Sequence, residues 1–353
     1  MSVPKTIRAI TLAASEAIVQ SISTPSLRPS YLLVKVYSVA LNPTDWKHIA
    51  GGRGAEPFSI VGCDFAGEVV QIGDEVTKSF KVGDKVFGCA HGSNSSEGYD
   101  GVFAEYAAVK GDTTMKLPKN ISFEDASTIG LGAITVGQGL FQKNKGLGLE
   151  FPGEGNGNGE WVLIYGGSTA TGTLGIQYAK QAGYKVVTTA SPHNHELVKS
   201  RGADAIFDYK DPSSASKIRE FTGNKLRYAW DTNGDDASAK YCADALSSKA
   251  GGHFGTILMN KAPRDDVKTT GTIMYTVFGE SFSKFGMDFP ASKDDFEFGK
   301  QWFNLTEKLV AEGKVVAHPA KVGNGGLEGV LQGLDDIKNG KVSGQKLVYN
   351  LLG

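Results

Sequence analysis

The chain has 353 residues, of which 37 are Lys or Arg and 38 are Asp or Glu. This length exceeds one typical core, so two domains are expected, and the charge balance argues against nucleic acid or an anionic membrane as a partner. The three cysteines form no CxxC pair, and the chain shows no signal peptide or long apolar run. We therefore expect a cytoplasmic protein without a disulfide framework or a membrane span.

Residues 30–116 contain short β-type runs that are separated by glycine and aspartate turns. The runs are YLLVKVYSVAL, FAGEVVQIG, DKVFGCA and FAEYAAVK. Because β-branched and aromatic residues predominate in them, this region is predicted to form an antiparallel β domain.

Strand-like and helix-like segments alternate from residue 161 to about residue 260. WVLIYG at 161–166 and YKVVTTA at 184–190 are apolar runs, and TGTLGIQYAKQAG at 171–183 has helical spacing. Several βαβ units in succession predict a mostly parallel, doubly wound sheet with helices on both faces, and thus an α/β fold.

Two other regions complete the predicted layout. The glycine-rich segment at 143–160 has little to bury, so an exposed loop is expected there. Residues 293–313 predict a long helix, and GQKLVYNLL at 344–352 predicts a last strand that returns to the first domain. The parallel sheet would then be an insertion within the first domain.

The stretch YGGSTATGTLG at 165–175 lies between the first apolar run and the first helix of the parallel region. Phosphate binds at this position in parallel sheets, because helix N-terminal amides and the helix dipole favour an anion. Its glycines allow a tight turn, and Ser168, Thr169 and Thr171 provide hydroxyl donors. A strand-to-helix turn with Ser168 as N-cap would need no ligand, but the context favours a phosphate loop.

The segment after the second apolar run bears on the choice of dinucleotide. An acidic side chain about twenty residues beyond the glycines would bind a ribose 2′-hydroxyl and repel a 2′-phosphate. TTASPHNH at 188–195 contains no acid, whereas Ser191, His193 and Asn194 offer neutral or cationic donors, and Tyr209 follows the third strand. The sequence therefore predicts NADPH, and a capping role for SPHN in the next helix is compatible with that.

The whole chain resembles the medium-chain dehydrogenase/reductase superfamily. The motifs that carry the resemblance are VALNPTDWK (39–47), VGCDFAGEV (61–69), FKVGDKVFG (80–88), GVFAEYAAV (101–109), VLIYGGSTATGTLGIQYAK (162–180) and KVSGQKLVY (341–349). The chain is most similar to the zinc-independent branch, with fungal enoyl reductases that act in trans on polyketide synthases and with quinone oxidoreductase-like proteins. The resemblance implies a GroES-like catalytic domain at 1–125, a Rossmann NADPH-binding domain at 126–300 and a C-terminal return at 301–353.

The resemblance also implies that no metal takes part. Asn42 stands where zinc-dependent relatives have a cysteine, and Cys63 with Asp64 replaces their His-Glu pair. The structural four-cysteine lobe is missing, and His91, expected to be a surface or loop histidine, cannot form a tetrahedral site alone.

Site residues follow from the same resemblance. In zinc-free relatives hydride reaches the β-carbon of a polarised C=C bond, while the protein stabilises the enolate oxygen and provides a route for the α-proton. Lys47 and Thr135 are the expected catalytic residues. A solvated lysine and a helix hydroxyl bonded to the preceding turn are the alternatives for these two. The expected substrate contacts are Gly132, Thr135, Val136 and Phe278. The expected cofactor contacts are Thr44, Asp45, Trp46, Lys47, Ser168, Thr169, Ala170, Thr171, Ser191, Pro192, His193, Asn194, Tyr209, Ile257, Leu258, Val342 and Ser343.

These features lead us to expect NADPH-dependent reduction of an activated C=C bond in an α,β-unsaturated thioester or enone. The substrate would be a small molecule or a carrier-bound acyl chain, with a polyketide synthase as the partner that the resemblance implies. Two alternatives stay open, namely a quinone oxidoreductase and a non-catalytic NADPH-binding scaffold protein. Both a monomer and a homodimer are compatible with the sequence.

Overall fold

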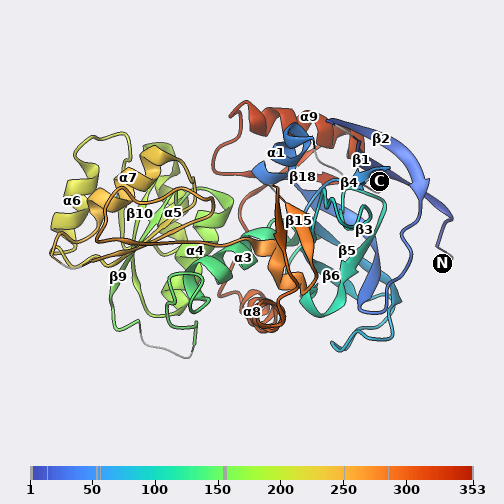
Figure 1. The fold of residues 1–353 in the computed structure, drawn as a ribbon, viewed down its shortest axis with the longest axis horizontal. Coiled ribbons are helices and arrows are strands. Elements are labelled where there is room, and N and C mark those ends of the chain that lie inside the picture. Colours follow the sequence, from blue (N-terminus) through green and yellow to red (C-terminus); the bar gives the residue numbers. More distant parts are fainter. Residues whose placement is uncertain are drawn as a thin grey trace. The chain divides into compact units, whose positions relative to one another are not determined.

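The computed structural model describes residues 3–13, 15–52, 55, 57–153, 157–249, 251–284 and 286–351. The chain divides into two compact units, each with its own sheets (Figure 1). The first unit comprises Met1–Leu131, Tyr275–Gly313 and Ala317–Gly353, and the second comprises Gly132–Met274 and Lys314–Val316. The second unit is therefore an insertion in the first, as the sequence predicts.

The first unit contains most of the β structure. Its strands are β1 (Thr6–Ala13), β2 (Glu16–Ser23), β3 (Tyr31–Ala40), β4 (Ser59–Ile60), β5 (Asp64–Ile72), β6 (Lys85–Cys89), β7 (Tyr106–Lys110), β8 (Met115–Lys116), β15 (Phe282–Lys284), β16 (Met287–Phe289), β17 (Ala320–Gly323) and β18 (Lys346–Asn350). Its helices are α1 (Pro43–Gly51), η1 (Gly111–Thr113), α2 (Phe123–Ser127), α8 (Lys293–Ala311) and α9 (Gly326–Lys338). Helix α3 (Gly130–Val136) and the short η4 (Met274–Phe278) run across two of the four points at which the chain passes from one unit to the other.

The main sheet of the first unit has the strand order β17-β18-β3-β5-β6-β8, with β7 also paired to β3. Strand β18 pairs antiparallel with β3, with Val348 opposite Ala40. The predicted return of the last strand to the first domain is therefore confirmed. Strands β2, β1 and β4 form a separate three-stranded sheet.

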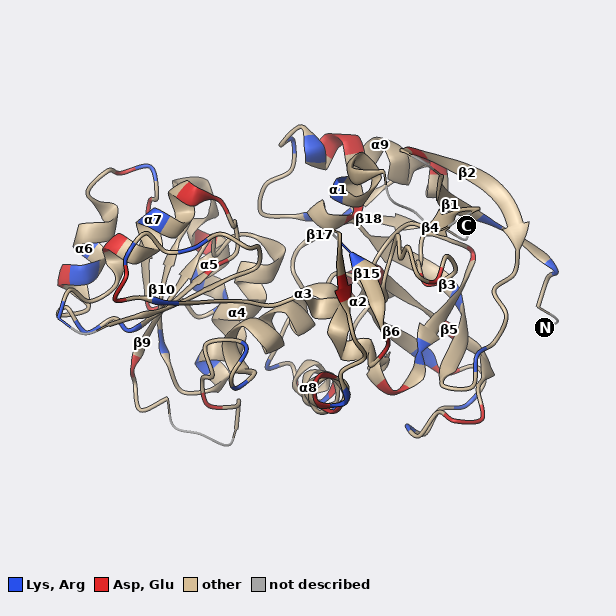
Figure 2. Ribbon diagram, viewed as in Figure 1, with Lys and Arg blue, Asp and Glu red and all other residues tan. Residues whose placement is uncertain are grey.

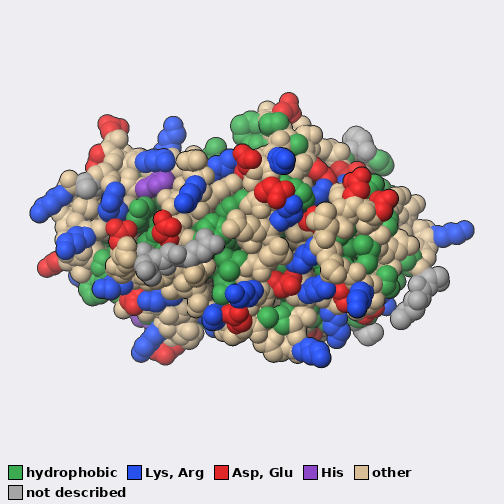
Figure 3. All heavy atoms as spheres, turned by 90° about the horizontal axis from the view of Figure 1, so that it is seen from below, with side chains coloured by type: hydrophobic (Ala, Val, Ile, Leu, Met, Phe, Trp, Pro, Cys, Tyr) green, Lys and Arg blue, Asp and Glu red, His purple; other side chains and the backbone are tan. Residues whose placement is uncertain are grey.

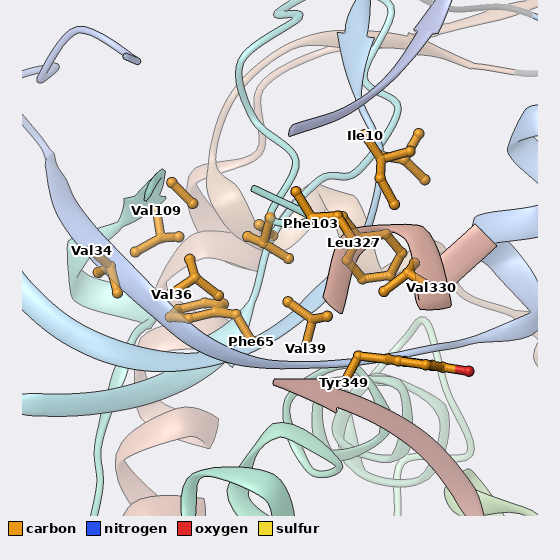
Figure 4. Packing of buried hydrophobic residues seen from close by; sticks show 14 of the residues in the cluster. Ile10, Val34, Val36, Val39, Phe65, Phe103, Val109, Leu327, Val330 and Tyr349 are labelled. Carbon is orange, nitrogen blue, oxygen red and sulfur yellow. The ribbon is translucent and has the colours of Figure 1, made fainter. Parts of the chain in front are cut away.

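Apolar side chains from several strands and one helix meet in the core of this unit (Figure 4). The labelled residues are Ile10, Val34, Val36, Val39, Phe65, Phe103, Val109, Leu327, Val330 and Tyr349. Burying each such side chain contributes about 1.5–3 kcal/mol, so the packing of α9 against β18 stabilises the sheet directly. Gly62 has a φ of 98°, and a Cβ there would lie 2.1 Å from the ring of Phe103, so this position requires glycine.

The second unit is built on a parallel sheet with the strand order β11-β10-β9-β12-β13-β14. The strands are β9 (Trp161–Tyr165), β10 (Lys185–Thr189), β11 (Ala205–Phe207), β12 (Tyr228–Asp231), β13 (His253–Thr256) and β14 (Lys268–Gly271). The helical segments are η2 (Gly137–Phe141), α4 (Ala170–Gln181), η3 (Pro192–Asn194), α5 (His195–Ser200), α6 (Ser214–Phe221) and α7 (Asp236–Ala245). In chain order this is the 3-2-1-4-5-6 arrangement of a Rossmann sheet, which confirms the predicted fold class.

The boundaries of the units differ from the expected domain limits at 126 and 300. The segment after Met274 belongs to the first unit because side chains there bind its β strands. Lys110 on β7 donates to Glu280 at 2.7 Å, and Lys78 donates to Glu307 on α8 at 2.7 Å. These contacts join residues far apart in sequence, so the local pattern could not place the boundary.

Charged residues of both signs are interspersed along the chain of each unit (Figure 2). The face in Figure 3 likewise mixes Lys and Arg with Asp and Glu. Such mixing provides no extended field of one sign to attract a polyanion. Within the part of the chain that the structure describes, we find no helix with the length and apolarity needed to cross a membrane.

Candidate active site

The loop between β9 and α4 is held in shape by its glycines and by neighbouring threonines. Gly166 has a φ of 76°, which favours glycine. A Cβ added to Gly172 would lie 2.2 Å from the carbonyl oxygen of Gly166, and one added to Gly167 would lie 2.0 Å from Thr188 Oγ1. A strand that enters a helix this tightly leaves the first amides of α4 at the end of the loop. The backbone therefore has the close-packed turn that a phosphate cradle needs.

The N-cap of α4 is Thr169, and not Ser168 as the capping alternative assumed. Thr169 Oγ1 accepts a hydrogen bond from the Gly172 amide at 2.9 Å and lies 3.0 Å from Thr232 Oγ1. Ser168 and Thr171 are half-buried, and their hydroxyls make no hydrogen bond with the described residues. Thr169 thus orders the loop, while Ser168 and Thr171 keep donors for a ligand.

A second pair of expected cofactor residues comes together at the ends of β10 and β11. Ser191 Oγ donates to Tyr209 Oη at 3.3 Å. The Tyr209 side chain is 41% exposed, whereas Ser191 and Asn194 are buried. Pro192 and His193 are exposed on η3. These residues extend from the carboxyl edge of the sheet, which is where ligands bind in this architecture.

Two further expected contacts, Ile257 and Leu258, follow β13 at the same edge. The Ile257 amide donates to the Asp231 carbonyl at 3.3 Å, and Leu258 is 40% exposed. The structure therefore brings the expected cofactor residues of the second unit to the ends of four strands of one sheet.

Helix α1 carries the expected cofactor residues 44–47 of the first unit. Asp45 is buried and serves the helix itself, because its Oδ2 accepts from the Asn42 amide at 2.7 Å. Burial raises the pKa of Asp45 to about 7. Trp46 is half-buried against the core, and Lys47 is exposed with its Nζ 5.8 Å from the Trp46 ring centroid. Asp45 is thus a capping residue, while the side chain of Lys47 extends into solvent.

The remaining expected site residues are distributed over both units. Lys47 and Phe278 belong to the first unit, and so do Val342 and Ser343, which precede β18. Gly132, Thr135 and Val136 belong to the second. Thr135 is half-buried on α3, whereas Val136 and Phe278 are buried.

A buried ionic network occupies the positions where zinc-dependent relatives have their ligands. Lys346 Nζ donates to Asp64 Oδ2 at 2.6 Å, and Asn42 Nδ2 donates to the same oxygen at 2.9 Å. The other oxygen, Oδ1, accepts from the Leu131 amide at 2.6 Å, and Lys346 also donates to the Thr128 carbonyl at 3.2 Å. Asp64 is fully paired by these contacts. Sequence reasoning missed Lys346, although a lysine inside an apolar final strand is an unusual residue.

A second buried cluster surrounds Tyr275, which sequence reasoning also missed. Tyr275 Oη lies 3.3 Å from Thr44 Oγ1 and 3.9 Å from Cys63 Sγ. His91 stacks on the Tyr275 ring at a centroid distance of 3.9 Å, and Lys284 Nζ lies 2.9 Å from His91 Nε2. His91 lies in the loop after β6, which is one of the two expected settings, and it is buried instead of lying at the surface.

Burial shifts the titration of this cluster. It lowers the pKa of Lys284 to about 8 and lowers the pKa of His91 well below its ordinary value, an effect that the neighbouring Lys284 charge reinforces. Burial also raises the pKa of the Tyr275 hydroxyl well above its ordinary value. At neutral pH the cluster therefore holds a neutral histidine, a protonated tyrosine and a lysine close to losing its proton.

Comparisons with known proteins agree with this architecture. Residues 28–119 match the model of the alcohol dehydrogenase GroES-like domain, and residues 170–278 match that of the zinc-binding dehydrogenase family. Among the residues that the structure describes, no group of three or more His, Cys, Asp or Glu could hold a metal ion. Most of the residues in the second match lie in the second unit.

The chain is similar to fungal proteins over nearly its whole length. It is 42% identical over 356 residues to a trans-enoyl reductase from Aspergillus sclerotiorum, covering 97% of this chain and 98% of that protein. It is 37% identical over 341 residues to the enoyl reductase component of lovastatin nonaketide synthase from Aspergillus terreus, covering 93% and 91%. An alcohol dehydrogenase superfamily structure from Novosphingobium aromaticivorans superposes with a TM-score of 0.79 at 23% identity, covering 98% and 100%. The chain belongs to the medium-chain dehydrogenase/reductase family and, within it, to the group of fungal trans-enoyl reductases.

Proposed function

We propose that this protein reduces the C=C bond of an α,β-unsaturated thioester or enone by metal-free hydride transfer from NADPH. The observation that carries the proposal is its 42% identity, across nearly the full length of both chains, to a trans-enoyl reductase. The Rossmann sheet and the glycine loop provide the site that a nicotinamide cofactor of this family requires.

NADPH is proposed in preference to NADH because of the residues after β10 and β11. Ser191 and Tyr209 present two hydroxyls 3.3 Å apart, and no acid occurs at 188–195. Hydroxyl donors suit a 2′-phosphate, whereas an acid there would repel it. Ser168 and Thr171 would hold the phosphates together with the first amides of α4.

The expected catalytic residues have distinct proposed roles. Bound NADPH supplies the hydride, so the protein needs to orient the substrate and stabilise charge that develops on its carbonyl oxygen. We assign charge stabilisation or cofactor binding to Lys47, which is exposed and cationic, and a hydrogen bond to the substrate to the Thr135 hydroxyl. Gly132, Val136 and Phe278 are the proposed apolar contacts of the acyl chain.

The donor set around Asp64 does not fit a catalytic zinc ion. Zinc in this family requires thiolate, imidazole or carboxylate ligands that are available to the metal. The Asp64 carboxylate is paired with Lys346, and the Cys63 thiol has a pKa raised well above its ordinary value by burial. We therefore propose a reaction in which polarisation comes from side chains.

A carrier-bound acyl chain on a polyketide synthase is the proposed physiological substrate, and the cytoplasm is the proposed location. The support for a synthase partner is that one relative is described as the enoyl reductase component of a nonaketide synthase. Whether this chain acts as a monomer or a homodimer does not affect that proposal.

The proposal is tested by following NADPH absorbance with the purified protein. We expect oxidation of NADPH with a short enoyl thioester and slow or no oxidation with a small quinone. Faster turnover of the quinone would identify a quinone oxidoreductase instead. Tight NADPH binding without oxidation by any enone, quinone or enoyl thioester would identify a non-catalytic binding protein.

Cofactor choice is tested with Ser191→Asp. The new carboxylate would stand at the Ser191–Tyr209 pair, so it should weaken NADPH binding by about 10- to 100-fold and leave NADH binding unchanged or stronger. Binding is measured by nicotinamide fluorescence with each cofactor. Ser200→Asp, at the exposed end of α5, is the control for an added charge. Equal loss of affinity for both cofactors would contradict the assignment of this pair to the 2′-phosphate.

A further inference from the structure

The cluster around Tyr275 brings together a phenol hydroxyl, the His91 imidazole and the Lys284 amino group, which a structural role alone does not require. Hydride addition at the β-carbon leaves an electron pair that needs a proton at the α-carbon, and the residues assigned above do not supply one. Tyr275 is near two proposed contacts, because its hydroxyl lies 3.3 Å from Thr44 Oγ1 and it shares the short helix η4 with Phe278. The proton for the α-carbon has to come from a donor that lies near the cofactor and substrate contacts.

A chain of hydrogen-bonding atoms leads away from the Tyr275 hydroxyl. Thr44 Oγ1 lies 3.3 Å from Tyr275 Oη and 3.5 Å from His48 Nε2. Thr44 and His48 are four residues apart on α1, so they share one face of the helix. Tyr275 is buried, whereas Thr44 and His48 are half-exposed. The chain therefore runs from a buried hydroxyl toward solvent.

We propose that the Tyr275 hydroxyl donates the proton to the substrate α-carbon and that Thr44 returns a proton to it. This inference rests on the proposed function. After hydride has formed the bond at the β-carbon, the O–H bond of Tyr275 breaks and the α-carbon electron pair forms the new C–H bond. The phenolate takes a proton from the Thr44 hydroxyl, whose oxygen also lies 3.5 Å from His48 Nε2, and the half-exposed Thr44 regains its proton from water. One proton from solvent is consumed in each turnover.

His91 and Lys284 act as positioning residues for this donor. His91 stacks on the Tyr275 ring with an interplanar angle of 15°, and Lys284 Nζ lies 4.2 Å from the ring centroid. A cation this close stabilises the negative charge that proton transfer leaves on the ring. We find no carboxylate paired with Lys284 among the described residues, so its charge is available to the tyrosine.

The other titratable groups around Tyr275 do not replace it as the donor. Cys63 is 3.9 Å from the hydroxyl, but burial raises the pKa of its thiol well above the ordinary value. Asp45 Oδ2 accepts from the Asn42 amide in the α1 cap, and its Oδ1 is buried without a hydrogen bond among the described residues. Burial lowers the pKa of His48 to about 3, so the imidazole beside Thr44 is neutral.

The experiment compares Tyr275→Phe with Tyr31→Phe in the full-length protein. Both tyrosines are buried in the same unit and lose hydroxyl contacts, Tyr275 those with Thr44 and Cys63 and Tyr31 its hydrogen bond to Glu280 at 2.7 Å. We expect Tyr275→Phe to lower kcat by about 100-fold, with KM and NADPH affinity little changed. Its solvent deuterium isotope effect should rise. Tyr31→Phe should keep the wild-type kcat and isotope effect.

The role of Lys284 is tested through the pH profile. Since burial lowers the pKa of Lys284 to about 8, the wild-type kcat should fall as pH rises through that value and the charge is lost. Lys284→Met should lower kcat and remove this dependence, whereas Lys284→Arg should retain kcat at high pH, because arginine stays charged. In the ligand-free protein, an NMR titration of Lys284 should give the same midpoint.

The outcomes separate the two proposals. A wild-type protein that oxidises no NADPH with enoyl thioesters would overturn the proposed function, and the donor role with it. An active wild type, with Tyr275→Phe as active as Tyr31→Phe, would overturn only the donor role. Should Tyr275→Phe fold poorly, Thr44→Val interrupts the same chain without touching the tyrosine, and unchanged kcat in that variant would overturn the relay.

Discussion

Replacing Asp64 by alanine should lower the free energy of unfolding by about 3–5 kcal/mol. The variant would leave the charge of Lys346 buried without its carboxylate partner. In the wild type, Lys346 Nζ donates to Asp64 Oδ2 at 2.6 Å, and both side chains are buried. Without the carboxylate, the lysine keeps only the Thr128 carbonyl as a partner. Urea unfolding of the wild type and the variant, followed by circular dichroism, measures the difference.

Two matched variants identify the cause of this loss. Asp64→Ala combined with Lys346→Met removes both charges and should recover much of the lost stability, because a buried ion pair can often be replaced by apolar groups. Asp244→Ala breaks an exposed pair with Lys240 and should cost less than about 1 kcal/mol. If the double variant is no more stable than Asp64→Ala, the effect comes from lost packing or lost contacts to Asn42 and Leu131.

The two-unit fold can be predicted from the sequence because the patterns that indicate it are local and repeated along the chain. Apolar runs alternating with amphipathic segments up to about residue 260 predict five of the six parallel strands of the second unit, all but β14, and KDDFEFGKQWFNLTEKLVAEG predicts helix α8. Even the long-range return of β18 follows, since a lone final strand needs a sheet to join. The limits of the units do not follow, because they depend on contacts such as Lys110 with Glu280.

Trp230 illustrates what the sequence could not show. An indole in a central strand of the second unit is unusual, and the pattern gives no reason for it. In the structure it is fully buried, and three glycines distant in sequence make room for it. A Cβ at Gly139 would lie 2.4 Å from its Nε1, one at Gly255 2.9 Å from its ring and one at Gly175 3.0 Å. Such packing is set by tertiary structure alone.

The prediction for the glycine-rich segment at 143–160 fails for a related reason. An exposed loop is expected there, yet Leu147 and Leu149 are buried. Leu147 contributes to the same packing, because a Cβ at Gly255 would also lie 3.2 Å from its Cδ2. Residues 154–156 lie outside the described residues. Glycine content predicts turns, but two leucines are enough to fix such a segment on a core.

The candidate site likewise has one part that the sequence predicts and another part that it does not. The loop at 166–172 and the Ser191–Tyr209 pair follow from motif position along βαβ units, so their proximity to one sheet edge is predictable. The Asp64–Lys346 network and the cluster of Tyr275, His91 and Lys284 join distant segments of the first unit and follow no motif. Apart from the lysine in an apolar strand their residues look ordinary in sequence, and burial alters the titration of Tyr275, His91 and Lys284.

A substitution in the loop at 166–172, the proposed phosphate site, should also have a large effect. The geometry of this loop leaves no room for a side chain at Gly172. Its φ is not in the left-handed region, so the constraint is purely steric. The added Cβ would lie 2.2 Å from the Gly166 carbonyl oxygen and 2.8 Å from Gly167 Cα, and both of these are backbone atoms that cannot rotate away. Any substitution there has to separate β9 from the first turn of α4.

Gly172→Ala should therefore weaken NADPH binding by at least about 100-fold, because the amides and hydroxyls of the loop would no longer converge on the phosphates. Nicotinamide fluorescence titration measures the affinity, and circular dichroism checks that the second unit remains folded. Gly51→Ala is the control, since a Cβ at the end of α1 meets no atom within 4 Å and should leave affinity unchanged. A folded Gly172→Ala protein with wild-type affinity would show that the phosphates bind elsewhere on the sheet edge.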